Sequence, residues 1–192
     1  MASKLRFLWV FWVFMATALW PGTAYADGWT VVAEESEIRF TGNQTGNPFE
    51  GRFETFTVQI DYDVGQPEKA FVRAVIDTGS AKTGDTQRDE AMPGKDWFFA
   101  SMFPSATFTA NGFAAHGDNQ FSTNGTLEIK GVQKNLEMPF SLSIDGNRAT
   151  MTSTVSLNRQ DFGVGVGPWA EGKWVGLDVE VAIKLVAVRK GS

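Results

Sequence analysis

Few residues of this sequence are of a type that could carry out catalysis. His116 is the one imidazole of the 192-residue chain, and it stands in a turn-forming stretch at residues 115–119. A Ser-His-Asp nucleophile or an imidazole general base would have to use it, although a turn would leave it in solvent. The absence of Cys excludes a thiol nucleophile, a disulfide scaffold and a zinc finger. We therefore expect no catalytic residue, no metal site and no enzyme.

Two short polar motifs each place an Arg beside a carboxylate. Arg88 and Asp89 lie in a stretch of helix formers, whereas Asn158, Arg159 and Asp161 follow a predicted strand. Such a group either fixes a loop through an ion pair or a cap, or contacts the head group of a ligand at the mouth of a barrel. Both interpretations stay open.

Aromatic side chains dominate the rest of the chain, since thirteen of the sixteen Phe and four of the seven Trp follow residue 26. A β-rich core uses aromatic rings as filler, but an apolar lining with few polar groups would also hold a lipid. The candidate ligand-binding residues are Phe40, Phe49, Phe53, Phe56, Trp97, Phe98, Phe103, Phe108, Leu127, Met138, Phe140, Phe162, Trp169 and Trp174.

The sequence predicts that the elements that position these residues are β-strands. Residues 56–62 alternate apolar and polar side chains, and this period of two indicates a half-buried strand. Turn signals rich in Gly, Pro, Asp and Asn lie between such stretches, which predicts a meander of antiparallel strands. Helix formers at 87–92, bounded by Gly84 and Pro93, predict one short helical segment. The same alternation recurs at 126–130, 136–144, 151–157 and 175–181.

A sheet of about eight long strands must protect its edges and cover its apolar face. Closure into a barrel does both, but a two-sheet sandwich buries the same faces, and periodicity does not separate the two. The long strands expected at 121–144 and 175–188, together with the aromatic excess, favour an all-β, eight-stranded antiparallel barrel.

The first 26 residues have the pattern of a secretory signal peptide. Lys4 and Arg6 precede an uncharged apolar run at 7–20, and the small-residue pattern Ala24-Tyr25-Ala26 follows. As a helix, that run would span about 21 Å, short of the roughly 30 Å hydrocarbon core that a membrane anchor must cross. We expect cleavage after Ala26 and one periplasmic domain at 27–192. Loss of Lys4 and Arg6 leaves 15 basic and 22 acidic residues, a net charge of −7, so nucleic acid is not an expected partner.

In order and spacing, the motifs after residue 26 resemble those of the YceI-like family of secreted, lipocalin-like proteins, often called polyisoprenoid-binding. The resemblance implies an extended barrel with a long apolar channel for a polyprenyl chain, a quinone tail or a similar lipid, in the periplasm of a bacterium. It also allows a homodimer and a membrane b-type cytochrome as protein partners. The motifs that carry the resemblance are Trp29-Thr30-Val31-Val32, Glu35-Ser36-Glu37-Ile38-Arg39-Phe40, Phe49-Glu50-Gly51-Arg52-Phe53, Ile76-Asp77-Thr78, Thr83-Gly84, Arg88-Asp89, Trp97-Phe98, Phe103-Pro104, residues 125–132 and residues 158–163.

Three functions are consistent with these observations. A carrier that holds a long-chain isoprenoid lipid needs only the apolar lining and no cofactor besides the bound lipid, and this is the function that we predict. An enzyme acting on the head group of such a lipid would use Arg88, Asp89, Arg159 or Asp161 and needs polar groups that converge at the channel mouth. A structural β-sandwich with a filled core would contain no cavity.

Overall fold

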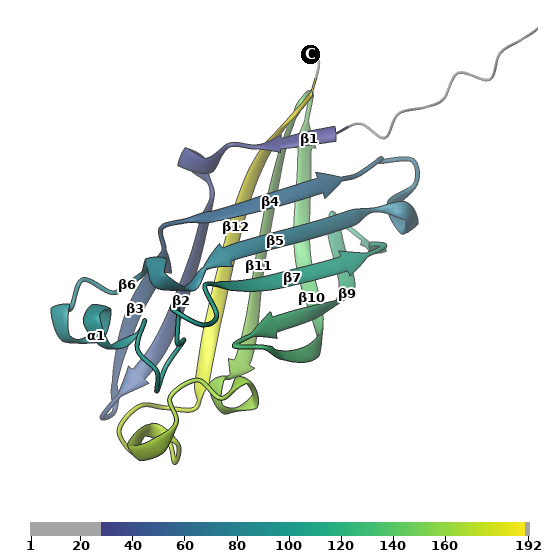
Figure 1. The fold of residues 1–192 in the computed structure, drawn as a ribbon. Helices are drawn as coiled ribbons and strands as arrows, with labels where there is room; N and C mark the ends of the chain where they lie inside the picture. Colours follow the sequence, from purple (N-terminus) through teal and green to yellow (C-terminus); the bar gives the residue numbers. More distant parts are fainter. Residues whose placement is uncertain (1–27, 191–192) are drawn as a thin grey trace, which may run out of the picture.

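The computed structural model describes residues 28–190, so the predicted signal peptide at 1–26 lies outside the described residues (Figure 1). Within this part the regular structure consists mostly of strands, with a single α-helix, α1 (Thr86–Ala91). The short 3-10 turns are η1 (Ala33–Glu35), η2 (Pro67–Lys69), η3 (Thr78–Ser80), η4 (Arg159–Phe162) and η5 (Gly167–Trp169). The strands are β1 (Gly28–Val31), β2 (Glu37–Gln44), β3 (Asn47–Phe53), β4 (Phe56–Asp61), β5 (Phe71–Asp77), β6 (Ala81–Lys82), β7 (Ser105–Asn111), β8 (Ala114–Gly117), β9 (Gln120–Ile129), β10 (Val132–Asp145), β11 (Arg148–Asn158) and β12 (Asp178–Arg189).

Eight of these strands close a barrel. They follow one another around it in the order β1, β4, β5, β7, β9, β10, β11, β12, and the ring closes because β12 also pairs with β1. The pairings within this ring are antiparallel. The predicted all-β, eight-stranded antiparallel barrel is therefore confirmed, and closure gives each of the eight strands a neighbour on both sides.

One end of the barrel is widened because β12 changes partner along its length. Residues 187–189 pair with β1, whereas residues 180–184 pair with β2 after the chain has turned through η1. From β2 the sheet continues into β3 and β6 rather than into β4. Figure 1 shows β2, β3, β6 and α1 together at the left of the view, with the loops between β11 and β12 below them. We call this the flared end of the barrel.

The alternation seen in the sequence corresponds to inward and outward faces. On β11, Ser153 and Val155 are buried, whereas Thr152, Thr154 and Ser156 point to solvent. The predicted helical segment is confirmed as α1, whose N-cap, Asp85, accepts a hydrogen bond of 3.0 Å from the backbone N–H of Arg88.

Two element boundaries predicted from the sequence are wrong. The strand predicted at 175–181 begins only at Asp178, because the carbonyls of Val175 and Gly176 accept hydrogen bonds from the Arg159 side chain. The turn predicted at 115–119 is confined to Asp118 and Asn119, both with positive φ, since Ala114–Gly117 form β8 and pair with β9.

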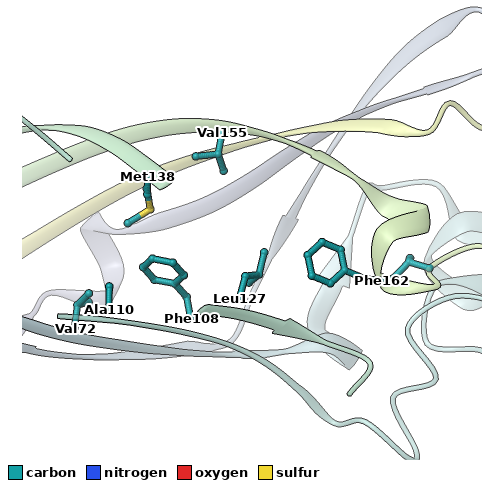
Figure 2. Close-up of a cluster of buried hydrophobic side chains, with 8 residues drawn as sticks. Val72, Phe108, Ala110, Leu127, Met138, Val155 and Phe162 are labelled. Carbon is teal, nitrogen blue, oxygen red and sulfur yellow. The ribbon is translucent and has the colours of Figure 1, made fainter. Parts of the chain in front are cut away.

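The middle of the barrel is filled by one cluster of buried apolar side chains, which Figure 2 shows. A second cluster lies at the β1 end around Trp29, Tyr62 and Phe140, and a third lies at the flared end around Phe40, Ala81 and Met92. We call the cluster in the middle of the barrel the barrel-centre cluster. Its residues are Val72, Phe108, Ala110, Leu127, Met138, Val155, Phe162 and Val164.

Candidate functional site

A cavity of about 410 Å³ lies at the flared end, enclosed by β2, β3, α1, the inner face of β12 and the loops between β11 and β12. This volume falls in the lower part of the roughly 300–1,000 Å³ range of small-molecule sites. Its lining is mostly aromatic and aliphatic, and the charged side chains in the lining are Asp85, Arg88 and Arg159. Seven predicted ligand-binding residues meet here: Phe40, Phe49, Phe53, Trp97, Phe98, Phe162 and Trp169.

Two reciprocal pairs of phenylalanine and glycine build the wall formed by β2 and β3. Phe40 on β2 is opposite Gly51 on β3, and Phe49 on β3 is opposite Gly42 on β2. A Cβ at position 51 would come within 2.3 Å of the Phe40 ring, and one at position 42 within 2.7 Å of the Phe49 ring. The far end of each ring therefore occupies the space over the opposite glycine, and both rings line the cavity.

Arg88 is held at the solvent side of the cavity by α1. Its Nη1 donates to Oε1 of Gln44 at 2.8 Å, its Nε donates to Oγ1 of Thr83 at 3.2 Å, and its guanidinium lies 4.7 Å from the centre of the Phe49 ring. Its ion-pair partner is Asp85, at 3.7 Å, and not its sequence neighbour Asp89. The hydrogen bonds to described residues use two of its five N–H donors, so Arg88 can donate to a ligand at this opening.

Asp89 does not line the cavity and holds the loop before α1. Its Oδ1 accepts hydrogen bonds from the backbone N–H of Thr83 at 2.7 Å and from the Thr83 hydroxyl at 2.8 Å. The Thr83 backbone hydrogen bond, with help from its hydroxyl, keeps the pKa of Asp89 below its usual value. These are the contacts of a loop-fixing residue.

Arg159 is buried in the cavity wall, with 5% of its surface exposed. Its five N–H donors all go to backbone carbonyls: Nε to Gly176, Nη1 to Val164 and Gly165, and Nη2 to Val175 and Trp169. Burial lowers the pKa of the guanidinium, but arginine remains protonated in proteins. Arg159 therefore ties the loop at 164–176 to the end of β11 and has no N–H group left for a head group.

The other members of that motif also fix the loop or face solvent. The Asn158 side chain caps η4 by accepting a hydrogen bond of 2.9 Å from the backbone N–H of Gln160. Asp161 is exposed, and in the described part of the chain it makes no ion pair with Arg159. Of the interpretations left open for this motif, the structure contains the loop-fixing cap by Asn158 and no Arg159–Asp161 ion pair, because carbonyl oxygens surround the guanidinium.

The remaining predicted ligand-binding residues lie elsewhere. Met138 and Phe140 line a second cavity of about 60 Å³ toward the β1 end, and Phe108 and Leu127 lie between the two cavities. The barrel-centre cluster lies between these two cavities and contributes residues to the lining of each. Outside both cavities are Phe56 at the start of β4, Phe103 against Phe99, and Trp174, which is half exposed beside Lys173.

Sequence reasoning missed several residues of the main cavity. Val179 and Val181 sit on β12, where the alternation already indicated an inward face. Gly42 lines the cavity and Gly51 lies against the Phe40 ring, and neither could be found from the sequence, since their role depends on which phenylalanine lies opposite. The other missed lining residues are Gln44, Asp85, Gln87, Ala91, Met92, Ile129, Leu157, Val164, Val175 and Gly176.

His116 lies on the exposed strand β8, and its Nε2 is 2.8 Å from Oγ of Ser122. It lines neither cavity. Among residues 28–190, no three His, Cys, Asp or Glu side chains are grouped as ligands of a metal ion. The described part of the chain also contains no helix of the length and hydrophobicity needed to cross a membrane.

A closed antiparallel barrel with an apolar cavity at one end places the chain in the class of small, cavity-bearing β-barrels. A family model described as the YceI-like domain matches residues 29–187, so the chain belongs to the YceI-like family. Its relatives include a UPF0312 protein of Shewanella sp. (strain W3-18-1), which is 28% identical over 153 residues, 76% of this chain and 80% of that protein.

Two of the solved structures that share the fold differ in how similar their sequences are to this chain. The crystal structure of Burkholderia cenocepacia BcnA has a TM-score of 0.79 and 30% sequence identity, over 82% of this chain and 99% of that one. A polyisoprenoid binding domain from Saccharophagus degradans, described as implicated in plant cell wall breakdown, has a TM-score of 0.71 and 17% identity, over 85% of this chain and 99% of that one. At that identity, the second likeness shows the fold alone.

Proposed function

We propose that this protein binds an isoprenoid lipid, with the apolar tail inside the cavity at the flared end and the polar head group at Arg88. The observation that carries the proposal is the cavity itself, which is about 410 Å³, largely apolar, and bordered at its solvent side by one arginine with N–H donors to spare. A relative of the same fold is described as a polyisoprenoid binding domain, which supports this ligand class.

The energetics suit a ligand without polar groups along its length. Each CH₂ group that is buried contributes about 0.8 kcal/mol, so one five-carbon isoprene unit contributes up to roughly 4 kcal/mol before ordering costs. Phe40, Phe53 and Phe98 supply the aromatic surface, and Val179 and Val181 the aliphatic surface, for such a tail. No hydrogen bond to the tail is needed for specific binding, because the shape of the cavity selects the ligand.

The contacts of the polar residues Asp89 and Arg159 support ligand binding rather than catalysis as the function. A general acid or base working near neutral pH would need a carboxyl with a raised pKa. Thr83 instead holds the pKa of Asp89 below its usual value, and the Arg159 donors are all used by the loop. We therefore propose a carrier rather than an enzyme that acts on the head group.

The biological setting of the carrier is also part of the proposal. The signal-peptide pattern at 1–26 supports delivery to the periplasm, where a water-soluble carrier would move a lipid between membranes or proteins. A quinone as ligand, a membrane b-type cytochrome as recipient and a homodimer stay predictions that rest on the resemblance to the family.

Native mass spectrometry of the mature protein, purified from a periplasmic fraction without detergent, tests the proposal. We expect a bound mass that an organic extract of the same sample identifies as an isoprenoid or a quinone. Phe53→Asp, which places a charge in the cavity wall, should lose that mass, whereas Trp174→Ala, outside both cavities, should keep it. An apo mass that persists after incubation with isoprenoid alcohols and quinones would contradict the proposal.

A further inference from the structure

The interior of the barrel is divided by three side chains that line neither cavity. Phe108, Leu127 and Val155 are each 7–8% exposed and belong to the same cluster as Phe162, which lines the larger cavity, and Met138, which lines the smaller one. Figure 2 shows this order across the barrel, with Met138 on one side, Phe162 on the other, and Phe108, Leu127 and Val155 between them. We call these three residues the central barrier.

The central barrier is built from three strands, and Phe108 is its largest member. Phe108 on β7 is opposite Leu127 on β9, and Val155 comes from β11. The other buried positions of β7 are Ala106 and Ala110, so Phe108 is the one bulky inward-facing residue on that strand. Without its ring, the inner face of β7 would present alanine alone.

The position of the Phe108 ring depends on a glycine. A Cβ at Gly125 would come within 2.5 Å of Cζ of Phe108, so the ring lies directly on the β9 backbone at that point. Gly125 precedes Leu127 by two residues on the same strand, and both therefore face the same side of the sheet. The Phe108 ring therefore lies beside Leu127, and the two side chains together fill the barrel along β9.

We propose that the central barrier sets the length of the isoprenoid tail that the barrel accepts, with Phe108 as the residue at which the tail ends. This inference rests on the proposed function. The tail enters past Arg88, fills the larger cavity as far as Phe162 and Leu157, and stops before the smaller cavity. The preferred ligand is then a short isoprenoid, or the terminal segment of a long one whose remaining units stay outside the barrel.

The expected signature is a plateau in affinity as the chain is lengthened. Each isoprene unit that enters the cavity tightens binding by about tenfold or more, since it buries several CH₂ groups. Units added after the tail has reached Phe108 bury nothing further and leave the dissociation constant unchanged.

The test measures dissociation constants of the mature protein for geraniol, farnesol, geranylgeraniol and geranylfarnesol. Tryptophan fluorescence is a suitable signal, because Trp97 and Trp169 line the cavity with ring centres 5.6 Å apart. We expect a plateau within this series for the wild type. Phe108→Ala joins the two cavities, so its affinity should keep rising and exceed that of the wild type for the longest alcohol by about tenfold or more.

Phe140→Ala is the matched control, because it enlarges the smaller cavity from the far side and leaves the central barrier in place. It should keep the wild-type plateau. Circular dichroism and thermal unfolding check that each variant is folded, and if Phe108→Ala does not fold, the smaller truncation Leu127→Ala decides in its place.

The outcomes separate the two proposals. A wild type that binds none of the four alcohols overturns both the proposed function and the barrier. A wild type whose affinity rises through the whole series, or a folded barrier variant that keeps the wild-type plateau, overturns the barrier while lipid binding stands.

Discussion

The ring of Phe40 lies on the backbone of Gly51, its partner across β2 and β3, and a Cβ at position 51 would come within 2.3 Å of the ring. Phe40 is nevertheless only 8% exposed and belongs to the buried cluster at the flared end. The absence of a side chain at position 51 therefore lets a large ring form the wall of the cavity without filling it.

Gly51→Ala should weaken lipid binding and also destabilise the fold. The new methyl group pushes the Phe40 ring toward the cavity, and overpacking of this kind costs roughly 1–3 kcal/mol. We expect about a tenfold weaker affinity for an isoprenoid alcohol in a fluorescence titration. Gly65→Ala is the control, because it lies in an exposed turn where its Cβ meets only Asp63 Oδ1 at 3.4 Å. Equal affinities for the two variants would show that position 51 does not shape the cavity.

Arg88→Met should separate head-group recognition from tail binding. A hydrogen bond to a charged group is worth about 1.5–3 kcal/mol, so the affinity for farnesyl diphosphate should fall by about tenfold or more. The affinity for a headless hydrocarbon such as farnesene should stay within about threefold, because the apolar walls are kept. Isothermal titration calorimetry measures both, with Arg73→Met on the exposed face of β5 as the control. A parallel loss for both ligands would instead assign Arg88 a structural role.

Local patterns predicted the strands, whereas the closure of the barrel depends on contacts between distant residues. The alternation at 151–157 is a property of a few neighbouring side chains, and the structure contains it as part of β11. The ring closes through Trp29 opposite Arg189 and Val31 opposite Ala187, pairs separated by about 160 residues of chain. No short segment carries the information for that register, nor for the switch of β12 from β1 to β2 that widens one end.

The candidate site was predictable in residue type but not in position. Phe40 and Phe108 are both buried aromatic residues on alternating strands, yet one lines the cavity and the other fills the barrel between the two cavities. Their difference lies in their height along the barrel, which alternation does not encode. Arg159 and Asp161 are close in sequence, but the loop at 164–176 folds back so that its carbonyls, rather than the carboxylate, surround the guanidinium.

Asp89 should make the loop before α1 sensitive to acid. Thr83 lowers the pKa of Asp89 in the folded protein relative to the unfolded chain. The Asp89 carboxylate therefore stabilises the fold fully at a pH above its pKa in the unfolded chain, and this stabilisation is lost as the pH falls through its lower pKa in the folded protein. Asp89→Asn should therefore flatten the acid side of the stability profile and lower stability at neutral pH. Urea unfolding from neutral to acidic pH measures this, with Asp118→Asn in an exposed turn as the control. Parallel profiles for wild type and Asp89→Asn would contradict the assigned role.

Arg159→Met should release the loop at 164–176 and open the wall of the cavity. The substitution removes the Arg159 donors from five backbone carbonyls, of which those of Val164 and Gly165 keep a hydrogen bond from the Gln160 side chain and those of Trp169, Val175 and Gly176 lose their side-chain donor. An unsatisfied buried polar group costs about 1–3 kcal/mol, so we expect roughly 3 kcal/mol of destabilisation after water has reached some of the carbonyls. Arg159→Lys should recover only part of the loss, because an ammonium has three donors where the guanidinium has five. Arg39→Met, at a half-exposed site on β2, is the matched control. Hydrogen exchange localises the effect through the backbone N–H groups of Gly165 and Gly176, which donate to the carbonyls of Asp96 and Asn43. In the Arg159→Met variant we expect these two groups to exchange faster than the N–H groups of β11. Unchanged protection would show that the loop holds its place without the arginine.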